Sequence, residues 1–368
     1  MFGQTLQFDF PRLLIRLSAY ILLSGLMLPG SLAGEDSPMS GPNRVVFQPG
    51  ATEGYLQAWN LNFRNSDFLI YTSFVISNTG PGDRNHGVSV LVFHNNRSMV
   101  YTAEFDQSTL KARAGTFGYQ GPAGYMRLQA NGSLELQIAV RDLRLQLVFD
   151  EIQPGMCLTG GRLIATESAD DFFQADIPVA FARASGSVSI QGHRHILSGS
   201  GGMEYLHTNR SPHVYARDFW LLRSYDPERG LFLGYLNGTD EFPEGRLARL
   251  VFMDHGRVVR DIRFNEMNVQ ATHRDVLSGF TLPMRSEFTD TSSGCRLQIQ
   301  AGRFQGGYEV LSNVSLLLRW VLQLLFSRPY IVHYNAAVDL SCPSGADNKL
   351  KSVYTSDRMQ STHYLLNE

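Results

Sequence analysis

The sequence is poor in cysteine, with three in 368 residues, and charged side chains make up only 18% of it. Three cysteines are too few for a disulfide scaffold or for several zinc sites. The formal net charge of −2 leaves no basic excess for nucleic acid. The chain also lacks GxSxG, HExxH and GxxxxGK[ST], and no GxGxxG opens a helix. These absences argue against the hydrolases, metalloproteases and nucleotide-binding enzymes that carry such motifs, and we expect neither a metal nor a cofactor.

The N-terminus has the three parts of an export signal. Arg12 and Arg16 precede the apolar run Leu17–Leu28, and small residues follow up to Ala33. Such a run is too short for a spanning helix, which needs about 20 residues. We therefore interpret residues 1–33 as a cleaved signal peptide, with an uncleaved membrane anchor as the alternative. The expected location is periplasmic or secreted.

Export also bears on the cysteines, because disulfides persist in oxidising compartments. Cys295 and Cys342 both lie late in the chain and could pair, which would leave Cys157 over. Three small buried thiols are an equally acceptable interpretation. A catalytic cysteine is not expected, because none of the three has a neighbouring histidine or a CxxC context.

The body of the chain is expected to be all-β. Apolar and polar residues alternate through 134–147 and again through 330–340, which is typical of strands with one buried face. Clusters of Gly, Pro, Asn and Asp interrupt the pattern at short intervals, as in a sandwich or barrel. Strands do not alternate with helices, so a doubly wound parallel sheet is not expected.

A weak internal repeat indicates two copies of one β unit. Leu91–Phe105 reads LVFHNNRSMVYTAEF and Leu250–Phe264 reads LVFMDHGRVVRDIRF, each after an aromatic strand and a turn that contains proline. We place the first domain at 34–185 and the second at 186–342. A polar, unpatterned stretch at 343–368 is expected to be a mobile tail.

Val314–Phe326 (VSLLLRWVLQLLF) departs from the β pattern, being apolar nearly all round. Arg319 and Gln323 are four residues apart and would share one face of a helix. We expect a short helix packed on a barrel, with a membrane-touching helix or a buried strand as alternatives. Its apolar surplus makes peripheral membrane contact a possible role.

The densest group of polar and aromatic residues lies in Gly199–Arg223 (GSGGMEYLHTNRSPHVYARDFWLLR). Glycines at its start permit a bulge or a close approach of backbones. The catalytic candidates, as acid–base groups, are Glu204, His207 and Asp218. The candidate ligand-binding residues are Tyr205, His207, His213, Tyr215 and Trp220. The alternative is a strand–loop–strand in which these residues are structural.

This segment carries a resemblance to a known family. The run GxGGMxYxH followed by SPHxxARDFW resembles the second-domain motif of the double-lipocalin superfamily, which includes carotenoid 1,2-hydratases, AttH proteins and ceramide-handling survival-factor proteins. Tyr55–Phe63 (YLQAWNLNF) is similar to that superfamily's opening aromatic strand. The resemblance covers roughly Asn43 to Leu340. It implies two consecutive lipocalin-like antiparallel β-barrels, with the ligand in or between them.

The match is incomplete at the position expected to carry the chemistry. Hydratase-like members have GxGYxDH in this motif, and if His207 takes the histidine place, their acid corresponds to Leu206. A leucine cannot donate a proton, and the SPH–ARDFW run is closer to the ceramide-handling members, which are lipid carriers. We therefore favour binding or transport of a hydrophobic lipid, sphingolipid-like or isoprenoid. The alternatives are a hydratase, isomerase or cyclase acting on an isoprenoid or polyketide, and a structural envelope protein.

Overall fold

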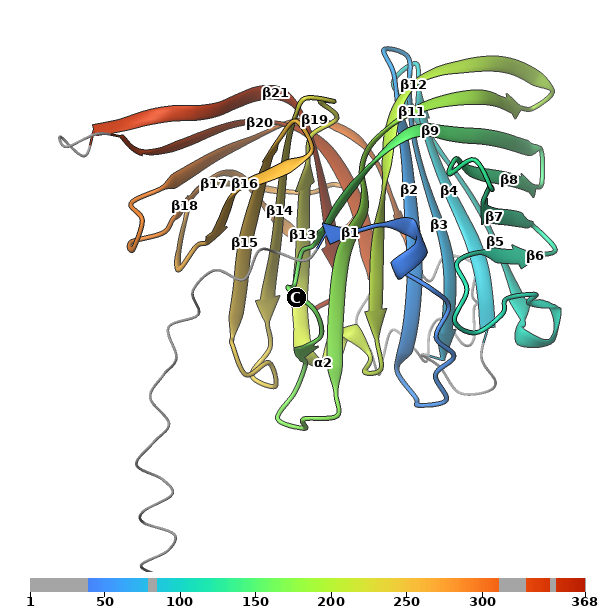
Figure 1. Cartoon of the computed structure of the whole chain (residues 1–368), viewed down its shortest axis with the longest axis horizontal. Helices are drawn as coiled ribbons and strands as arrows, with labels where there is room; N and C mark the ends of the chain where they lie inside the picture. The colour runs from blue at the N-terminus through green and yellow to red at the C-terminus, as the bar shows by residue number, and fades with distance from the viewer. Residues whose placement is uncertain (1–38, 79–84, 311–328, 345–348, 368) are drawn as a thin grey trace, which may run out of the picture. The chain divides into compact units, whose positions relative to one another are not determined.

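The structure, a computed structural model, describes residues 39–78, 85–310, 329–344 and 349–367 (Figure 1). Among these residues, twelve strands form the first antiparallel sheet, in the order β5-β4-β3-β2-β12-β11-β9-β8-β7-β6, while β1 pairs with β9 and β10 pairs with β11. The bounds of these strands are β1 Met39–Ser40, β2 Tyr55–Arg64, β3 Phe68–Asn78, β4 Asn85–His94, β5 Arg97–Asp106, β6 Tyr119–Gly121, β7 Gly124–Leu128, β8 Leu134–Val140, β9 Leu143–Cys157, β10 Leu163–Ile164, β11 Phe172–Ile190 and β12 His193–Thr208.

Nine further strands of the described chain form the second antiparallel sheet, in the order β16-β15-β14-β13-β21-β20-β19-β18-β17. Its strands are β13 Ala216–Arg223, β14 Arg229–Gly238, β15 Arg246–Asp254, β16 Arg257–Arg263, β17 Glu266–Arg274, β18 Thr281–Thr289, β19 Arg296–Glu309, β20 Tyr330–Ser344 and β21 Lys349–Leu365. The short helices of the described part are η1 Pro42–Arg44, η2 Gln107–Thr109 and α2 Pro212–Tyr215.

The two sheets share one strand order. In each, a meander of four strands (β2–β5 and β13–β16) lies at one edge, and the last strand in sequence pairs with the first strand of that meander: β12 with β2, and β21 with β13. The repeated LVF segments fall on equivalent hairpins, β4–β5 and β15–β16. The prediction of an all-β chain with two consecutive lipocalin-like barrels is therefore confirmed.

Two-residue turns of left-handed backbone close the hairpins. Asn95 and Asn96 join β4 to β5 with φ of 50° and 63°, and His255 and Gly256 join β15 to β16 with φ of 48° and 73°. Turns of this hand match the twist of the flanking strands. The Asp254-His255-Gly256 stretch of the second LVF segment thus forms the turn of a hairpin.

Alternation along the strands gives each sheet two faces with different roles. The inner face of the first sheet carries a core that includes Trp59, Leu61 and Phe63, and the inner face of the second carries Trp220 and Leu222 with their neighbours. The opposite faces of β2, β3, β12, β13, β20 and β21 pack against each other, as contacts between these strands show. All described residues belong to one compact unit, Ser37–Glu368.

Two features differ from the sequence analysis. The chain passes from the first sheet to the second between Thr208 and Ala216, whereas we placed the boundary at 185/186. The expected mobile tail is wrong for Lys349–Leu365, because β21 is paired on both sides, with β13 and with β20. Backbone pairing to two neighbours holds this strand in place although it is rich in polar residues.

The signal peptide expected at 1–33 and the apolar helix expected at Val314–Phe326 lie outside the described residues. Within the described part, no helix has the length and apolar character needed to cross a membrane. Cys295 and Cys342 form a disulfide across 47 residues of sequence, so of the two interpretations of the cysteines the single bridge is correct. Cys157 is free and half-buried.

Candidate functional site

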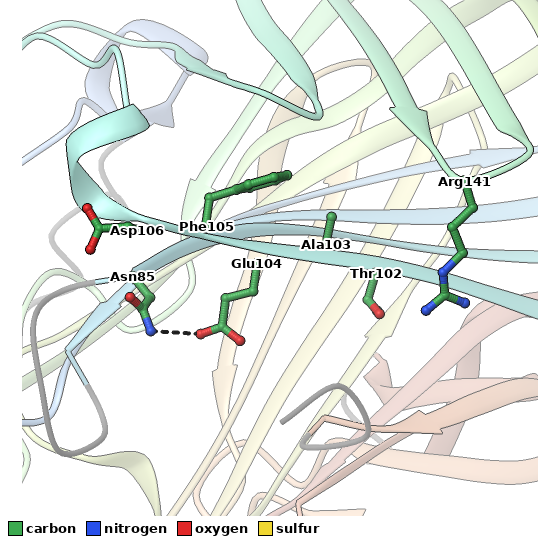
Figure 2. A pocket seen from close by; sticks show the side chains of 7 residues that line it. All are labelled: Asn85, Thr102, Ala103, Glu104, Phe105, Asp106 and Arg141. Carbon is green, nitrogen blue, oxygen red and sulfur yellow. Dashed lines mark hydrogen bonds between the residues drawn. The ribbon is translucent and has the colours of Figure 1, made fainter. Parts of the chain in front are cut away.

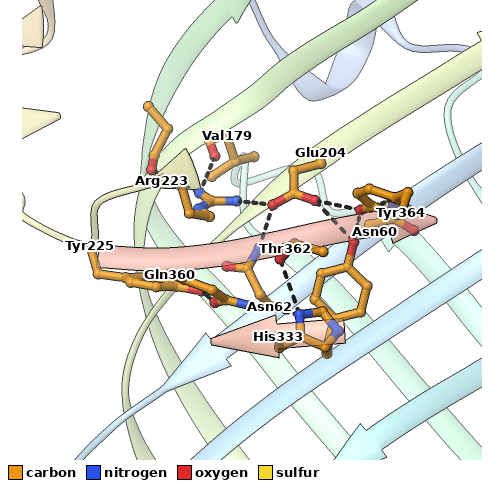
Figure 3. A network of polar contacts seen from close by, with 12 residues as sticks. Asn60, Asn62, Val179, Glu204, Arg223, Tyr225, His333, Gln360, Thr362 and Tyr364 are labelled. Atoms are coloured by element: carbon orange, nitrogen blue, oxygen red, sulfur yellow. Dashed lines mark hydrogen bonds and ion pairs between the residues drawn. The ribbon is translucent and has the colours of Figure 1, made fainter. Parts of the chain in front are cut away.

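A buried carboxylate with four donors lies between the two sheets. Glu204 on β12 is 4% exposed. Its Oε1 accepts hydrogen bonds from Arg223 Nη1 at 3.2 Å and from Asn62 Nδ2 at 3.3 Å, and its Oε2 accepts from the hydroxyls of Tyr71 at 3.0 Å and Tyr364 at 3.3 Å. The two tyrosine hydroxyls also contact each other. Figure 3 shows Glu204 with Arg223, Asn62 and Tyr364 around it. We call these five residues the Glu204 centre.

Strand alternation explains why these side chains meet. Asn60 and Asn62 sit between the inward-facing aromatic and aliphatic residues of β2, so they point to the other sheet. Glu204 takes the same orientation on β12, which pairs with β2 in a register that sets Glu204 opposite Asn60. Tyr364 reaches the same point from β21 and accepts a hydrogen bond from Asn60 Nδ2 at 3.4 Å. The centre is therefore built from both ends of the chain.

Arg223 is held by backbone as well as by Glu204. Its side chain is 1% exposed, and Nη2 donates to the carbonyl oxygens of Val179 at 3.2 Å and Ala180 at 3.1 Å. The pairing of β11 with both neighbours is interrupted around Val179, and such irregularities free carbonyls from the ladder. A Cβ on Gly202 would lie 1.9 Å from Arg223 Nη2, so this position needs glycine. A glycine singled out in the sequence thus makes room for the guanidinium.

The charges of the centre compensate each other. Burial raises the pKa of Glu204, while Arg223 and the hydroxyl of Tyr71 oppose that change by stabilising the carboxylate. Burial, and next the charge of Glu204, raise the pKa of Tyr71 and of Tyr364, so both phenols are neutral donors. The result is one buried ion pair surrounded by neutral polar groups.

A second polar group adjoins the centre through Tyr71. The imidazole of His333 on β20 lies 4.6 Å from the Tyr71 ring, between centroids. Its Nδ1 contacts Thr362 Oγ1 at 3.0 Å and Gln360 Nε2 at 3.3 Å, and Gln360 Oε1 in turn accepts from the hydroxyl of Tyr225. Burial lowers the pKa of His333 to about 3, so this ring is neutral near pH 7.

Three buried polar atoms in this layer have no partner: Asn62 Oδ1, Arg223 Nε and His333 Nε2. A buried donor or acceptor left without a hydrogen bond costs about 1–3 kcal/mol. Native proteins rarely leave such atoms unpaired without water or a ligand to satisfy them. All three lie beside the Arg223–Glu204 ion pair or next to Tyr71, which contacts Glu204.

Apolar clusters flank the polar layer. One joins Ile177 and Ala180 of the first sheet to Leu221 and Phe232 of the second. The other packs Tyr71 and its neighbours on β4 and β5 against side chains of β19 and β20. The space between the sheets is thus polar in the middle and apolar on both sides.

A separate groove runs along the edge strand β5. Its volume is about 470 Å³, and it is lined by the residues shown in Figure 2: Asn85, Thr102, Ala103, Glu104, Phe105, Asp106 and Arg141. Asn85 Nδ2 donates to Glu104 Oε1 at 2.9 Å. The lining is mostly polar, and the groove shares no residue with the Glu204 centre.

The residues predicted from the sequence are spread over several environments. Only Glu204 belongs to the centre. Tyr205 and His207 lie on the opposite face of β12: the Tyr205 hydroxyl accepts from Gln57 Nε2 at 2.6 Å, and the His207 ring lies 4.9 Å from that of Phe172. Burial lowers the pKa of His207 to about 4, and its Nδ1 has no partner. His207 is therefore a neutral group of the first sheet's interior.

The other predicted residues lie toward the second sheet. Asp218 accepts from Asn237 Nδ2 at 2.8 Å, and burial raises its pKa. Trp220 donates from Nε1 to Ser361 Oγ at 2.7 Å and is 2% exposed. His213 and Tyr215 belong to α2, where Tyr215 is buried and His213 is half-buried. None of these residues contacts Glu204 through a hydrogen bond among those the structure describes.

Sequence reasoning missed most of the Glu204 centre: Asn62, Tyr71, Arg223 and Tyr364. A signal was available for Asn60 and Asn62, which are polar residues two apart within an otherwise apolar strand, and so face one way. No such signal marks Arg223, whose environment depends on a strand of the other sheet. In the described part of the chain, no group of three or more His, Cys, Asp and Glu side chains is placed to hold a metal.

Comparisons with known proteins support the fold. No family model matches the sequence, and no curated protein matches it either. A solved structure from Nitrosomonas europaea, provisionally assigned as an AttH, is similar over 84% of this chain and 92% of its own, with 12% identity and a TM-score of 0.58. CghA crystallised with Sch210972 is similar over 85% of this chain and 89% of its own, with 10% identity and a TM-score of 0.57. CghA crystallised alone is similar over 86% of this chain and 89% of its own, with 10% identity and a TM-score of 0.56. The chain thus has the fold of these AttH-like and CghA structures.

Proposed function

We propose that this protein binds a hydrophobic lipid or isoprenoid non-covalently, with the polar end of the ligand at the Glu204 centre. The observation that carries the proposal is the set of three unpartnered polar atoms, on Asn62, Arg223 and His333, inside a layer that is apolar on both sides. A ligand with one polar group and an aliphatic body would give the unpartnered atoms a hydrogen-bond partner and would place its apolar part against the apolar clusters. Each methylene moved out of water contributes about 0.8 kcal/mol.

The fold supports this proposal. Ligand sites are concave, mostly apolar and equipped with a few oriented polar groups, and they are common between packed units. CghA, which shares the fold at 10% identity, was crystallised with Sch210972. By analogy, the two-sheet architecture of this chain is suited to hold an organic ligand.

Export is part of the proposal. The Cys295–Cys342 disulfide is compatible with an oxidising compartment, as is the signal peptide expected at 1–33. Peripheral membrane contact through Val314–Phe326 stays a prediction from sequence. A lipid carrier in the periplasm or outside the cell would use both features.

Native mass spectrometry of the purified chain tests the proposal, followed by titration with the fluorescent apolar probe N-phenyl-1-naphthylamine. We expect co-purifying lipid, and competition between that lipid and the probe. Asn62→Leu should weaken lipid binding, because it removes polar atoms of the centre. Thr72→Val is the matched control, since the Thr72 hydroxyl is also buried and unpartnered but lies on the strand β3 face away from Tyr71. Absence of any bound lipid, together with no probe binding, would contradict the proposal.

A second candidate function is acid–base catalysis on an isoprenoid or polyketide, as a hydratase, isomerase or cyclase. The observation in its favour is that Glu204 and Leu206 lie two residues apart on β12 and so share a face. The carboxyl group of Glu204 therefore lies two residues from Leu206, on the same face of the strand. Leu206 is the position that corresponds to the acid of hydratase-like members. His207 and Asp218 lie outside the centre, so Glu204 would be the acid–base group. Turnover of an isoprenoid substrate that is lost in a Glu204→Gln variant shown by circular dichroism to be folded would establish this function over that of a carrier.

A further inference from the structure

The hydrogen bonds around His333 fix which nitrogen carries its proton. Gln360 Oε1 accepts from the Tyr225 hydroxyl, and the amide NH₂ group at the other end faces the imidazole. An amide nitrogen can only donate, so His333 Nδ1 must accept from Gln360 Nε2 at 3.3 Å. A neutral imidazole that accepts at Nδ1 carries its hydrogen on Nε2. Thr362 Oγ1, at 3.0 Å from Nδ1, is then a second donor to the same nitrogen.

The Nε2–H group of His333 is therefore a buried donor without a partner. The residue is 0% exposed, and Nε2 makes no hydrogen bond. The neighbouring Tyr71 ring lies 4.6 Å from the imidazole, between centroids. Tyr71 is itself tied to Glu204 at 3.0 Å. The donor therefore lies beside the Glu204 centre.

We propose that His333 Nε2–H binds the carbonyl oxygen of a hydrophobic ligand, and that Gln360 and Tyr225 position it by fixing its tautomer. The assignment rests on the proposed ligand site between the sheets. Because His333 Nε2–H is a donor, the ligand group that it binds must be an acceptor such as an oxygen. The charges around the site favour a neutral carbonyl over a carboxylate. The positive charge of Arg223 is already paired with Glu204, so a buried anion would lack a counter-charge.

The tautomer can be measured without any ligand. In the full chain labelled with ¹⁵N-histidine, we expect the His333 imidazole to show one protonated nitrogen, Nε2, at pH 7. The ring should stay neutral as the pH is lowered to about 5, because burial lowers its pKa to about 3. A resonance pattern of the Nδ1–H tautomer, or of a doubly protonated ring at pH 7, would overturn the assignment.

Ligand preference is tested with two molecules of the same shape. The ketone 2-tridecanone and the alkene 2-methyltridec-1-ene differ in C=O against C=CH₂. We expect the wild type to bind the ketone about five- to tenfold more tightly, as one neutral hydrogen bond allows. His333→Phe should remove this preference, whereas Thr362→Val, which keeps Nε2–H, should retain it. Infrared spectra of ¹³C-labelled ketone should show a lowered carbonyl stretch in the wild type that returns toward the alkane-solvent value in His333→Phe.

The outcomes separate the two proposals. If the ketone and the alkene bind equally well to a folded wild type, the ligand site stands and the role of His333 is wrong. If neither molecule nor any co-purified lipid binds, the site between the sheets is refuted, and the role of His333 with it. If the ketone is preferred but His333→Phe keeps the preference and the lowered carbonyl stretch, another donor binds the carbonyl and the assignment is overturned.

Discussion

Arg223 and Glu204 come from different sheets, yet their side chains meet at 3.2 Å with only 1% and 5% of their surfaces exposed. Neither charge has water to stabilise it, so each depends on the other and on the hydrogen bonds around the pair. The pair therefore couples the packing of the two sheets to the polar groups between them.

Removing one charge of this pair should destabilise the protein strongly. Glu204→Gln leaves Arg223 buried without a counter-charge, and we expect a loss of about 3–5 kcal/mol in the free energy of unfolding. The double variant Glu204→Leu/Arg223→Met removes both charges and should recover much of that loss. Urea unfolding of the three proteins measures the difference. Equal free energies of unfolding for wild type and Glu204→Gln would show that the ion pair does not stabilise the fold.

Gly202 should not accept even a methyl group. A Cβ there would lie 1.9 Å from Arg223 Nη2, so Gly202→Ala forces the buried guanidinium to move. We expect a loss of about 1–3 kcal/mol, as for other overpacked cores. In an Arg223→Met background the same substitution should cost less, because the guanidinium is gone while the Val179 carbonyl oxygen, 2.7 Å from the same Cβ, remains. A thermal or urea unfolding cycle of the four proteins reports this coupling, and additive effects would contradict the explanation.

The buried histidines predict a pH dependence of stability. Burial lowers the pKa of His207 from 6.5 to about 4, so between these values the unfolded chain binds a proton that the folded chain does not. Stability contributed by this residue is complete above about pH 6.5 and is lost as the pH falls toward 4, by up to about 1.4 kcal/mol per pH unit.

The comparison with His207→Leu isolates this contribution, because buried acids such as Asp176, whose pKa is raised by burial, titrate with the opposite sign. Unfolding free energies at pH 7.0, 5.5 and 4.5 should fall more steeply in the wild type than in His207→Leu. Parallel pH profiles of the two proteins would refute the prediction.

The Cys295–Cys342 disulfide should contribute to the stability of the second sheet. It closes a loop across 47 residues, and loop closure of this length is worth about 4 kcal/mol in the unfolded chain. We expect Cys295→Ala/Cys342→Ala to unfold at lower urea concentration, and reduction of the wild type to have the same effect. Cys157→Ala, at a half-buried free thiol, is the control and should change the midpoint little.

The repeat and the strand class could be predicted from the sequence because both depend on local alternation. The LVF hairpins, the Asp-His-Gly turn and the alternation at 134–147 are each contained in a few consecutive residues. The strand β21 could not be found in this way. Gln360, Thr362 and Tyr364 face the first sheet while Ser361 and His363 face inward, so polar residues occupy both sides and no alternation is visible.

The candidate site was only partly predictable for the same reason. Glu204 stood out because it lies among glycines and aromatic residues in one short segment. Arg223 and Tyr364 carry no local mark of burial, since their partners come from strands that are distant in sequence. The acid that the resemblance would place at position 206 is absent, because this position is a leucine, and Glu204 lies two residues earlier on the same face of β12.

The equivalent strand order has a consequence for biosynthesis. The first sheet receives its last strand, β12, by Thr208, so it can close while the rest of the chain is still being made. The second sheet waits for β21, Lys349–Leu365, which is made some 150 residues after β12. Until β21 has been made, β13 has an unpaired edge, Arg223 is less buried, and the Tyr364 hydroxyl cannot contact Glu204. The Glu204 centre is thus completed only after the first sheet, and a chain that stops before Lys349 would have a finished first sheet and an unfinished site.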